Sequence, residues 1–286
     1  MQYITLNNGN KIPVLGFGVY EIPENQTKQA VLDAIDVGYR MIDTAQIYYN
    51  EAEVGEAVSQ CGVDREELFI TTKVWLSNYG YEECKDSVYR SLKRLNMDYI
   101  DLVLLHEPYY DYYSSYRALE DLYDEGIVKS IGVSNFSPSK LTDLCLFGRK
   151  VIPQFNQIEC HPLNAGYSNQ ANMEKCGVQM GAWSPLGQGE PEIINNETLM
   201  EIGEKYNKSA VQVVLRWLVQ RSIVPAVKSV HKERMAENID IFDFVLDEED
   251  MLKIMGLNTD ESLFFEVEDP ESVEDFEEMY WEDGKI

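Results

Sequence analysis

The 286-residue chain lacks long hydrophobic runs, and no stretch approaches the roughly 20 apolar residues that a membrane span needs. Its five cysteines are odd in number and form no CxxC pair, which favours free thiols in a reducing compartment over a disulfide framework. The opening residues, MQYITLNNGNKIP, lack the basic and apolar regions of a secretory signal. We therefore expect a cytoplasmic protein without a membrane partner.

Basic residues are scarce, since 24 Lys and Arg stand against 50 Asp and Glu, for a net charge of −26 and a pI near 4.4. A surface of this sign repels nucleic acid and anionic membranes, so neither is an expected partner. In such a chain a cluster of Lys and Arg is informative, because an anionic ligand would need one.

Histidine is also scarce. The three histidines form no HxH or HExxH pattern, so we expect no zinc or iron site. No sequence feature marks an interface between subunits, and a monomer is the prediction.

The acidic excess is partly local. Twelve Asp and Glu between Asp260 and Ile286 stand against the single Lys285. This composition favours a solvated acidic extension over a binding arm, although Phe276 and Trp281 indicate that part of it packs. We expect residues 258–286 to form an acidic C-terminal tail or loop of a single domain that spans residues 1–286.

The rest of the chain alternates between strand-like and helix-like segments. Ile4 to Leu6 and Lys11 to Leu15 flank Asn7-Asn8-Gly9-Asn10, which predicts a hairpin. Apolar runs then end near Phe17-Gly18, Ile42-Asp43, Thr72-Lys73, Leu105-His106, Val133-Ser134, Asn156-Gln157, Trp183-Ser184 and Lys228-Ser229. Helical spacing of apolar residues follows at 27–37, 51–60, 81–95, 114–125, 138–147, 167–176, 197–221 and 232–240.

Eight strand-then-helix units predict an α/β fold, a (β/α)8 TIM barrel with an N-terminal β-hairpin. The alternative is an open doubly wound sheet, which would normally carry a GxGxxG turn after its first strand. The nearest match, Gly16-Phe17-Gly18, continues Val-Tyr-Glu and does not fit. Barrel chemistry lies at the carboxyl ends of the strands, where this chain places polar residues one unit after another.

Four of these polar residues suggest a common chemistry. Asp43, Lys73 and His106 end successive apolar runs, and Tyr48 follows Asp43 in the next loop. Each of these residues alone could have a purely structural role, as a helix cap, a strand end or a histidine of the core. Together they fit a phenol whose pKa, ordinarily near 10, is lowered by an ammonium that a carboxylate holds in place. A phenol that protonates a carbonyl oxygen needs a hydride source, which implies a nicotinamide cofactor.

The sequence resembles a bacterial-type aldo-keto reductase over residues 4 to 260. GYRMIDTAQIYYNEAEVG at 38–55, KSIGVSNF at 129–136 and KSVHKERMAEN at 228–238 are similar to three signatures of that family. ITTKVW at 70–75, LLHEPY at 104–109, NQIECHP at 156–162 and WSPLG at 183–187 fall where the family has its other blocks.

The resemblance implies Tyr48 as general acid, with Asp43, Lys73 and His106 completing a catalytic tetrad. It also implies a set of cofactor contacts, namely Ser134, Asn135, Gln157, Trp183, Ser184, Leu186, Lys228, Ser229, Arg234, Glu237 and Asn238. Lys228, Ser229 and Arg234 would bind a 2′-phosphate, so we expect NADPH (NADP+), with NADH as the alternative. The alternative, that Lys232 and Arg234 are only solvated helix charges, fits Lys232 better than Arg234.

The substrate side departs from the family pattern. Tyr20 and Trp75 are the expected substrate walls, and Tyr109, Tyr110 and Tyr112 are further candidates. Glu107 is the third expected substrate contact, at a position where many relatives have an aromatic residue, and its carboxylate favours polar substrates. Pro225-Ala226-Val227 also precedes Lys228, where the family often has Pro directly before the Lys-Ser pair.

The predicted function is NADPH-dependent reduction of an aldehyde or ketone to an alcohol, on a small carbonyl substrate. Two alternatives stay open. One is a non-catalytic scaffold that binds cofactor on the same fold. The other is a Schiff-base aldolase that uses Lys73. The pair Cys160-His161 resembles a thiolate nucleophile but is read as structural.

Overall fold

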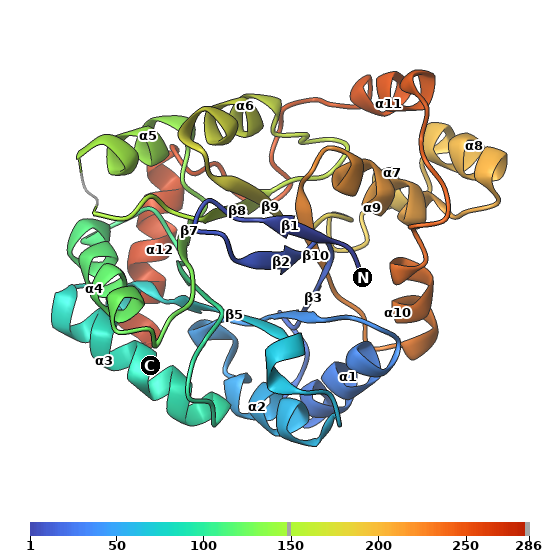
Figure 1. Cartoon of the computed structure of the whole chain (residues 1–286). Helices are drawn as coiled ribbons and strands as arrows, with labels where there is room; N and C mark the ends of the chain where they lie inside the picture. The colour runs from blue at the N-terminus through green and yellow to red at the C-terminus, as the bar shows by residue number, and fades with distance from the viewer. Residues whose placement is uncertain (148–149, 284–286) are drawn as a thin grey trace.

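A closed barrel of eight parallel strands forms the centre of the computed structural model, which describes residues 1–147 and 150–283 (Figure 1). The strands follow the order β10-β3-β4-β5-β6-β7-β8-β9, and β10 pairs with β3 to close the ring. Their bounds are β3 Gly16–Gly18, β4 Met41–Asp43, β5 Phe69–Val74, β6 Leu102–Leu105, β7 Ile131–Ser134, β8 Phe155–Glu159, β9 Gln179–Trp183 and β10 Val224–Val227. The predicted (β/α)8 barrel is confirmed, and the open doubly wound sheet is excluded.

Helices surround the barrel and cover its strands (Figure 1). Those expected from the sequence are α1 Glu24–Asp36, α2 Glu51–Gln60, α3 Tyr81–Leu95, α4 Tyr112–Asp124, α5 Pro138–Phe147, α6 Tyr167–Cys176, α8 Glu197–Tyr206, α9 Ala210–Gln220 and α10 Lys232–Ile239. The structure adds α7 Pro191–Ile194, α11 Glu248–Met255, α12 Pro270–Asp283 and the 3-10 turns η1 Gln46–Tyr48, η2 Arg65–Glu67 and η3 Leu76–Asn78. No helix in residues 1–147 or 150–283 is both long and apolar enough to span a membrane.

The helical segment expected at 197–221 is in fact two helices. Asn207 ends α8 in the left-handed region, with φ of 56°, and Ser209 starts α9. Ser209 and Gln212 form a reciprocal capping box, in which each side chain accepts a hydrogen bond from the other residue's backbone N–H. The apolar spacing runs through this break, but the Ser-x-x-Gln spacing of Ser209 and Gln212 marks the start of the second helix in the sequence.

The N-terminal hairpin closes the amino end of the barrel and is the predicted one. Strands β1 (Tyr3–Thr5) and β2 (Lys11–Pro13) pair antiparallel and face the viewer in Figure 1. Ile12 is fully buried in a cluster with Met41 and Phe155 from the barrel strands. Because this end is packed with side chains, the carboxyl ends of the strands are left for a site.

The C-terminal segment, expected at 258–286 as a tail or loop, contains helix α12. Its last three residues, 284–286, lie outside the described residues. Phe276 of α12 packs against Trp75 and Tyr109, with ring centroids 6.1 and 5.3 Å away. Trp75 directly follows β5, so this segment lies over the carboxyl end of the barrel.

Helices α2 and α3 approach closely at Gly55, the last residue of the 38–55 motif. A Cβ added at Gly55 would lie 2.2 Å from the backbone oxygen of Leu95, much closer than atoms can pack. We expect Gly55→Ala to lower the free energy of unfolding by about 1–3 kcal/mol, because the two helices must move apart. Urea unfolding followed by circular dichroism measures this. The exposed Ser59→Ala substitution on α2 is the control, and equal stability of both variants would contradict the close contact.

Candidate functional site

Asp43 and Lys73 form a buried ion pair at the carboxyl end of the barrel. Asp43 is the last residue of β4 and Lys73 lies on the adjacent β5, and their side chains are almost fully buried. Lys73 Nζ donates to Asp43 Oδ1 and to the main-chain oxygen of Thr44 at 3.1 Å. Since burying a single charge is strongly unfavourable, each member compensates the charge of the other and holds it in place.

Tyr48 lies directly above this pair. Lys73 Nζ donates to the Tyr48 hydroxyl oxygen at 3.4 Å, so the phenol oxygen accepts there and its own proton points elsewhere. Sequence reasoning expected a lowered pKa for Tyr48. In the structure its pKa lies well above 10, because burial first, and then the nearness of the acidic groups of Asp43, Tyr20 and Glu107, disfavours the phenolate. Tyr48 is therefore a neutral phenol with a proton to donate.

His106 follows β6 and lies beside Tyr48 and Trp75. Its ring centroid is 5.8 Å from that of Tyr48 and 5.2 Å from that of Trp75, both edge-on. Burial and the nearby Lys73 ammonium lower the pKa of His106 well below 6.5, so the imidazole is neutral. Its Nδ1 is buried without a partner among the described residues. A neutral imidazole next to the phenol can donate one N–H to an oxygen atom in the site.

Glu107 is turned toward Asn135, although the sequence suggested that it contacts substrate. Both carboxyl oxygens of Glu107 lie 3.0 Å from Asn135 Nδ2, which donates to them. The Asn135 Oδ1 in turn accepts from Trp183 Nε1 at 2.7 Å. Burial raises the pKa of Glu107 well above 4.5, against the opposing effects of Asn135 and Lys73. The carboxyl ends of β6, β7 and β9 are thus linked at the mouth by one chain of hydrogen bonds.

Gln157 on β8 has the geometry of a carboxamide contact. Its Nε2 donates to Asp43 Oδ2 at 3.1 Å, while its Oε1 is buried without a partner among the described residues. Ser134 Oγ donates to the main-chain oxygen of Gln157 at 2.9 Å and holds the two strand ends together. An amide group entering the site can donate to Gln157 Oε1, so these residues fit the nicotinamide carboxamide.

The residues expected at a phosphate lie after β10 and on α10. Lys228 and Arg234 are exposed, and neither forms an ion pair with any described residue. Ser229 Oγ accepts from the His231 N–H at 3.0 Å, just before α10 begins at Lys232. Two unpaired cations beside a helix N-terminus fit a phosphate in a chain this acidic.

Lys232 differs from its two basic neighbours in this region. Its Nζ binds Asp36 Oδ2 at 2.5 Å and lies 3.8 Å from Asp33 Oδ1 on α1. Lys232 is therefore paired with α1 and is not a free solvated charge.

The other expected cofactor residues lie along the same rim. Ser184 and Leu186 follow β9, and Ser184 has a φ of 46°. Asn238 is buried on α10, and Glu237 on the same helix accepts from Ser209 Oγ at 2.6 Å. The barrel places all of these residues at its carboxyl end and at α10, as the sequence led us to expect.

Aromatic side chains form the walls of the mouth. Tyr20 lies 5.0 Å from Tyr48, ring to ring, and Trp75 touches His106. Tyr109 donates to the main-chain oxygen of Val267 at 2.8 Å. Tyr110 and Tyr112 pack instead against Tyr280 and against Tyr113 and Phe136.

Three further aromatic side chains belong to this mouth, namely Phe264, Phe265 and Phe276, and of these the sequence indicated only that Phe276 packs. Phe264 and Phe265 pack on Trp183, with ring centroids 5.1 and 6.0 Å away. The letters SLFF were visible at 262–265, but no local pattern says which surface such a segment covers.

The side chains of Cys160 and His161 have different hydrogen-bond partners in the structure. Burial raises the pKa of the Cys160 thiol to about 12, and its Sγ donates to the main-chain oxygen of Ala165 at 3.4 Å. His161 binds Glu159 and Asn164 instead. A protonated thiol without its histidine is not a nucleophile, so their structural reading holds. No group of three His, Cys, Asp or Glu suited to a metal ion occurs in the described part of the chain.

The closed barrel and the polar cluster at the carboxyl ends of its strands define a (β/α)8-barrel enzyme. The aldo/keto reductase family model matches residues 14–259, and the chain belongs to that family. It is therefore an oxidoreductase that acts on carbonyl compounds with a nicotinamide cofactor.

Relatives of known name or structure agree with this assignment. Glyoxal reductase of Bacillus subtilis is 46% identical over 260 residues, which cover 90% of this chain and 93% of the relative. An aldo-keto reductase from a Medee basin deep-sea metagenome library matches with a TM-score of 0.91 and 41% identity, over 93% of this chain and 98% of the other. The Bombyx mori aldo-keto reductase in complex with NADP matches with a TM-score of 0.88 and 34% identity, over 96% and 97%.

The raised pKa of Glu107 makes a prediction about stability and pH. A carboxyl group that is protonated in the folded state and ionised in the unfolded state makes stability fall as pH rises above about 4.5. We expect Glu107→Gln, which is uncharged in both states, to gain stability relative to the wild type from pH 5 to pH 8. Urea unfolding at each pH measures the difference, and the exposed Glu66→Gln corrects for the loss of one negative charge. Parallel pH profiles would contradict the assignment.

Proposed function

We propose that the protein reduces aldehydes and ketones to alcohols with NADPH, and that Tyr48 is the general acid. The observation that carries this proposal is the position of the Tyr48 hydroxyl. Its oxygen accepts a hydrogen bond from Lys73, whose ammonium is held by Asp43, and neutral His106 lies alongside. No other tyrosine in the described chain lies within hydrogen-bonding distance of this buried ion pair.

In this proposal each side chain has one task. NADPH, when bound, supplies the hydride. His106 donates an N–H to the substrate's carbonyl oxygen and orients it toward Tyr48. Tyr48 then gives its proton to that oxygen, and the Lys73 ammonium stabilises the negative charge left on the phenol. Asp43 keeps Lys73 charged and in position throughout.

The same rim supports the choice of NADPH over NADH. Gln157 Oε1 would accept from the carboxamide, with Ser134 and Asn135 next to it and Trp183 against the ring. Ser184 and Leu186 would lie along the pyrophosphate, and Glu237 and Asn238 near the adenine. Lys228, Ser229 and Arg234 would bind the 2′-phosphate, a group that NADH lacks.

The substrate walls favour carbonyl compounds that present an apolar or aromatic face. Tyr20 and Trp75 flank the phenol and the imidazole, while the Glu107 carboxyl is engaged with Asn135. The name of the 46% identical relative, glyoxal reductase, adds α-dicarbonyl compounds to the candidates.

The contacts of Lys73 argue against a Schiff-base aldolase. Its ammonium is bound by Asp43, Thr44 and Tyr48, and a lysine held in the charged form is a poor amine nucleophile. All four expected tetrad residues lie together, which also disfavours a scaffold without catalysis. We further propose that residues 1–286 form one domain and that the protein is a cytoplasmic monomer.

Tyr48→Phe is the direct test of the general acid. We expect kcat/KM with NADPH and a panel of aldehydes, ketones and α-dicarbonyls to fall by about 100-fold or more, because the phenyl ring has no proton to give. NADPH affinity, followed by quenching of tryptophan fluorescence, should stay close to that of the wild type. Turnover by the variant at the wild-type rate would refute the role of Tyr48, and failure of the wild type to bind either nicotinamide cofactor would refute the proposed function.

Arg234→Ala tests the phosphate contact, with Lys232→Ala as a matched control on the same helix. Arg234 forms no ion pair in the described chain, whereas Lys232 is paired with Asp36. We expect Arg234→Ala to weaken NADPH binding by roughly tenfold or more, the effect of one charge-assisted hydrogen bond, and to leave NADH binding unchanged. Lys232→Ala should change neither. Equal losses for NADPH and NADH would show that Arg234 does not contact the 2′-phosphate.

A further inference from the structure

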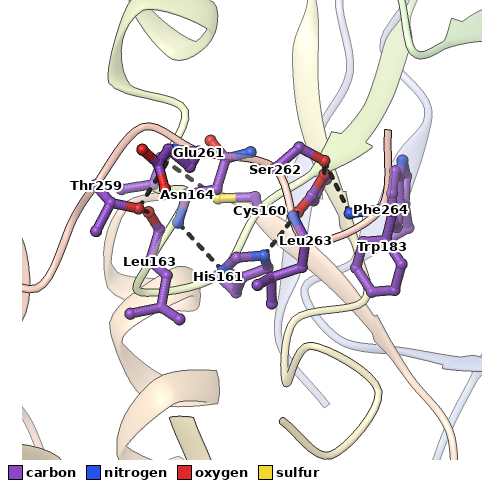
Figure 2. Close-up of polar contacts among 12 residues, drawn as sticks. Cys160, His161, Leu163, Asn164, Trp183, Thr259, Glu261, Ser262, Leu263 and Phe264 are labelled. Carbon is purple, nitrogen blue, oxygen red and sulfur yellow. Dashed lines mark hydrogen bonds and ion pairs between the residues drawn. The ribbon is translucent and has the colours of Figure 1, made fainter. Parts of the chain in front are cut away.

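The loop after β8 holds the C-terminal segment through several hydrogen bonds. Thr259 donates from its N–H and its Oγ1 to the main-chain oxygen of Leu163, at 2.8 and 3.0 Å. Asn258 Oδ1 accepts from the Ala165 N–H at 2.8 Å. Figure 2 shows this contact region, in which residues 259–264 run beside residues 160–164. We call residues 258–265 the anchored segment.

Glu159, the last residue of β8, is the centre of this contact. Its Oε1 accepts from His161 Nε2 at 2.8 Å and from the Leu263 N–H at 2.9 Å. Its Oε2 accepts from Ser262 Oγ at 2.5 Å. Glu159 is 8% exposed, so a carboxylate is buried at the rim with three donors and no lysine or arginine among its hydrogen-bond partners.

The proton on His161 can be placed from its contacts. The backbone N–H of Asn164 donates to His161 Nδ1 at 3.1 Å, so Nδ1 is an acceptor and carries no proton. Nε2 must then carry the proton that it donates to Glu159. His161 is fully buried, and its position is fixed on both sides. It therefore holds the Glu159 carboxylate in one orientation.

Ser262 connects Glu159 to two aromatic residues, Phe264 and Phe265, through hydrogen bonds. Its hydroxyl donates to Glu159 and accepts from the N–H groups of Phe264 and Phe265, both at 3.0 Å. The two rings pack on Trp183, and the ring planes of Phe265 and Trp183 differ by only 11°. Figure 2 shows Ser262, Leu263 and Phe264 next to Trp183.

We propose that Glu159, supported by His161, is a positioning residue for substrate binding, because through Ser262 it places Phe264 and Phe265 against Trp183 at the barrel mouth. This inference rests on the proposed function, in which Trp183 lies against the nicotinamide ring that the carbonyl compound must approach. None of the hydrogen bonds of Glu159 reaches Tyr48, Lys73 or His106. Loss of Glu159 should therefore weaken substrate binding and leave the chemical step nearly unchanged.

Glu159→Gln tests these hydrogen bonds directly, because it keeps the size of the side chain and changes its hydrogen-bonding groups. The carboxyl oxygens accept from His161 Nε2, from the Leu263 N–H and from the Ser262 hydroxyl, whose own oxygen already accepts from two N–H groups. An amide NH2 in place of either carboxyl oxygen therefore removes an acceptor that this arrangement uses. Ser262→Ala removes the middle of the relay without altering the barrel rim. Two variants serve as controls. Ser262→Thr keeps the hydroxyl group. Glu261→Gln removes one negative charge, as Glu159→Gln does, but on the exposed side chain next to Ser262.

Hydrogen exchange of the full chain, read by mass spectrometry, tests the anchor without any reaction. We expect Ser262→Ala and Glu159→Gln to speed exchange of peptides containing the amides of Leu263, Phe264 and Phe265 by about tenfold or more, since their acceptors are lost or turned away. Peptides from β4, β5 and β6 should exchange as in the wild type. Ser262→Thr and Glu261→Gln should exchange at wild-type rates. Unchanged exchange in both test variants would overturn the proposal.

Steady-state kinetics test the effect on the site. We expect the KM for a carbonyl substrate to rise about tenfold in Ser262→Ala and Glu159→Gln, with kcat within about twofold of the wild type. A fall in kcat with unchanged KM would overturn the positioning role even if exchange is faster. A wild type that reduces no carbonyl would instead refute the proposed function, and the exchange result would still report on the anchor.

Discussion

The buried ion pair between Lys73 and Asp43 is the constraint on which the rest of the site depends. Two opposite charges on adjacent strands can be buried only when the barrel brings β4 and β5 into register and when both partners are present. Once they are buried, the same pair places an ammonium against the Tyr48 oxygen, lowers the pKa of His106 and receives the Gln157 amide. One electrostatic contact thereby links four strands.

Several basic side chains elsewhere in the described chain tie one helix to another through a carboxylate. Lys85 ties α3 to the end of α4, and Lys205 ties α8 to α11. Lys228, just after β10, and Arg234, on α10, have no such ion pair among the described residues and lie six residues apart in an otherwise acidic chain. The negative field elsewhere would direct an anionic ligand toward this end.

Much of this arrangement was predictable from the sequence, and the reason is periodicity. Apolar runs that each end on a polar residue predicted the barrel, its strand ends and the meeting of Asp43, Lys73 and His106. The break after Asn207 is marked in the sequence only by the Ser-x-x-Gln spacing of Ser209 and Gln212, a helix-start signal, because the apolar spacing continues across it. The turn of Glu107 toward Asn135 and the direction of the Tyr48 pKa were also missed, since both depend on burial and on contacts between strands. The packing of Phe264 on Trp183 joins residues 81 positions apart, which no local pattern encodes.

The pairing of β10 with β3 has a consequence for how the protein is made. Ala226 lies opposite Gly16, so the ring closes between residues near the two ends of the barrel sequence. A chain emerging from the ribosome can form helices and early strand pairs, but it cannot close the barrel before β10 is released. The side chains of the mouth come from Tyr20, after β3, to Phe276, on α12, so no shorter nascent chain holds a complete site. During synthesis the unpaired edge of β3 is therefore exposed for most of the time that translation takes.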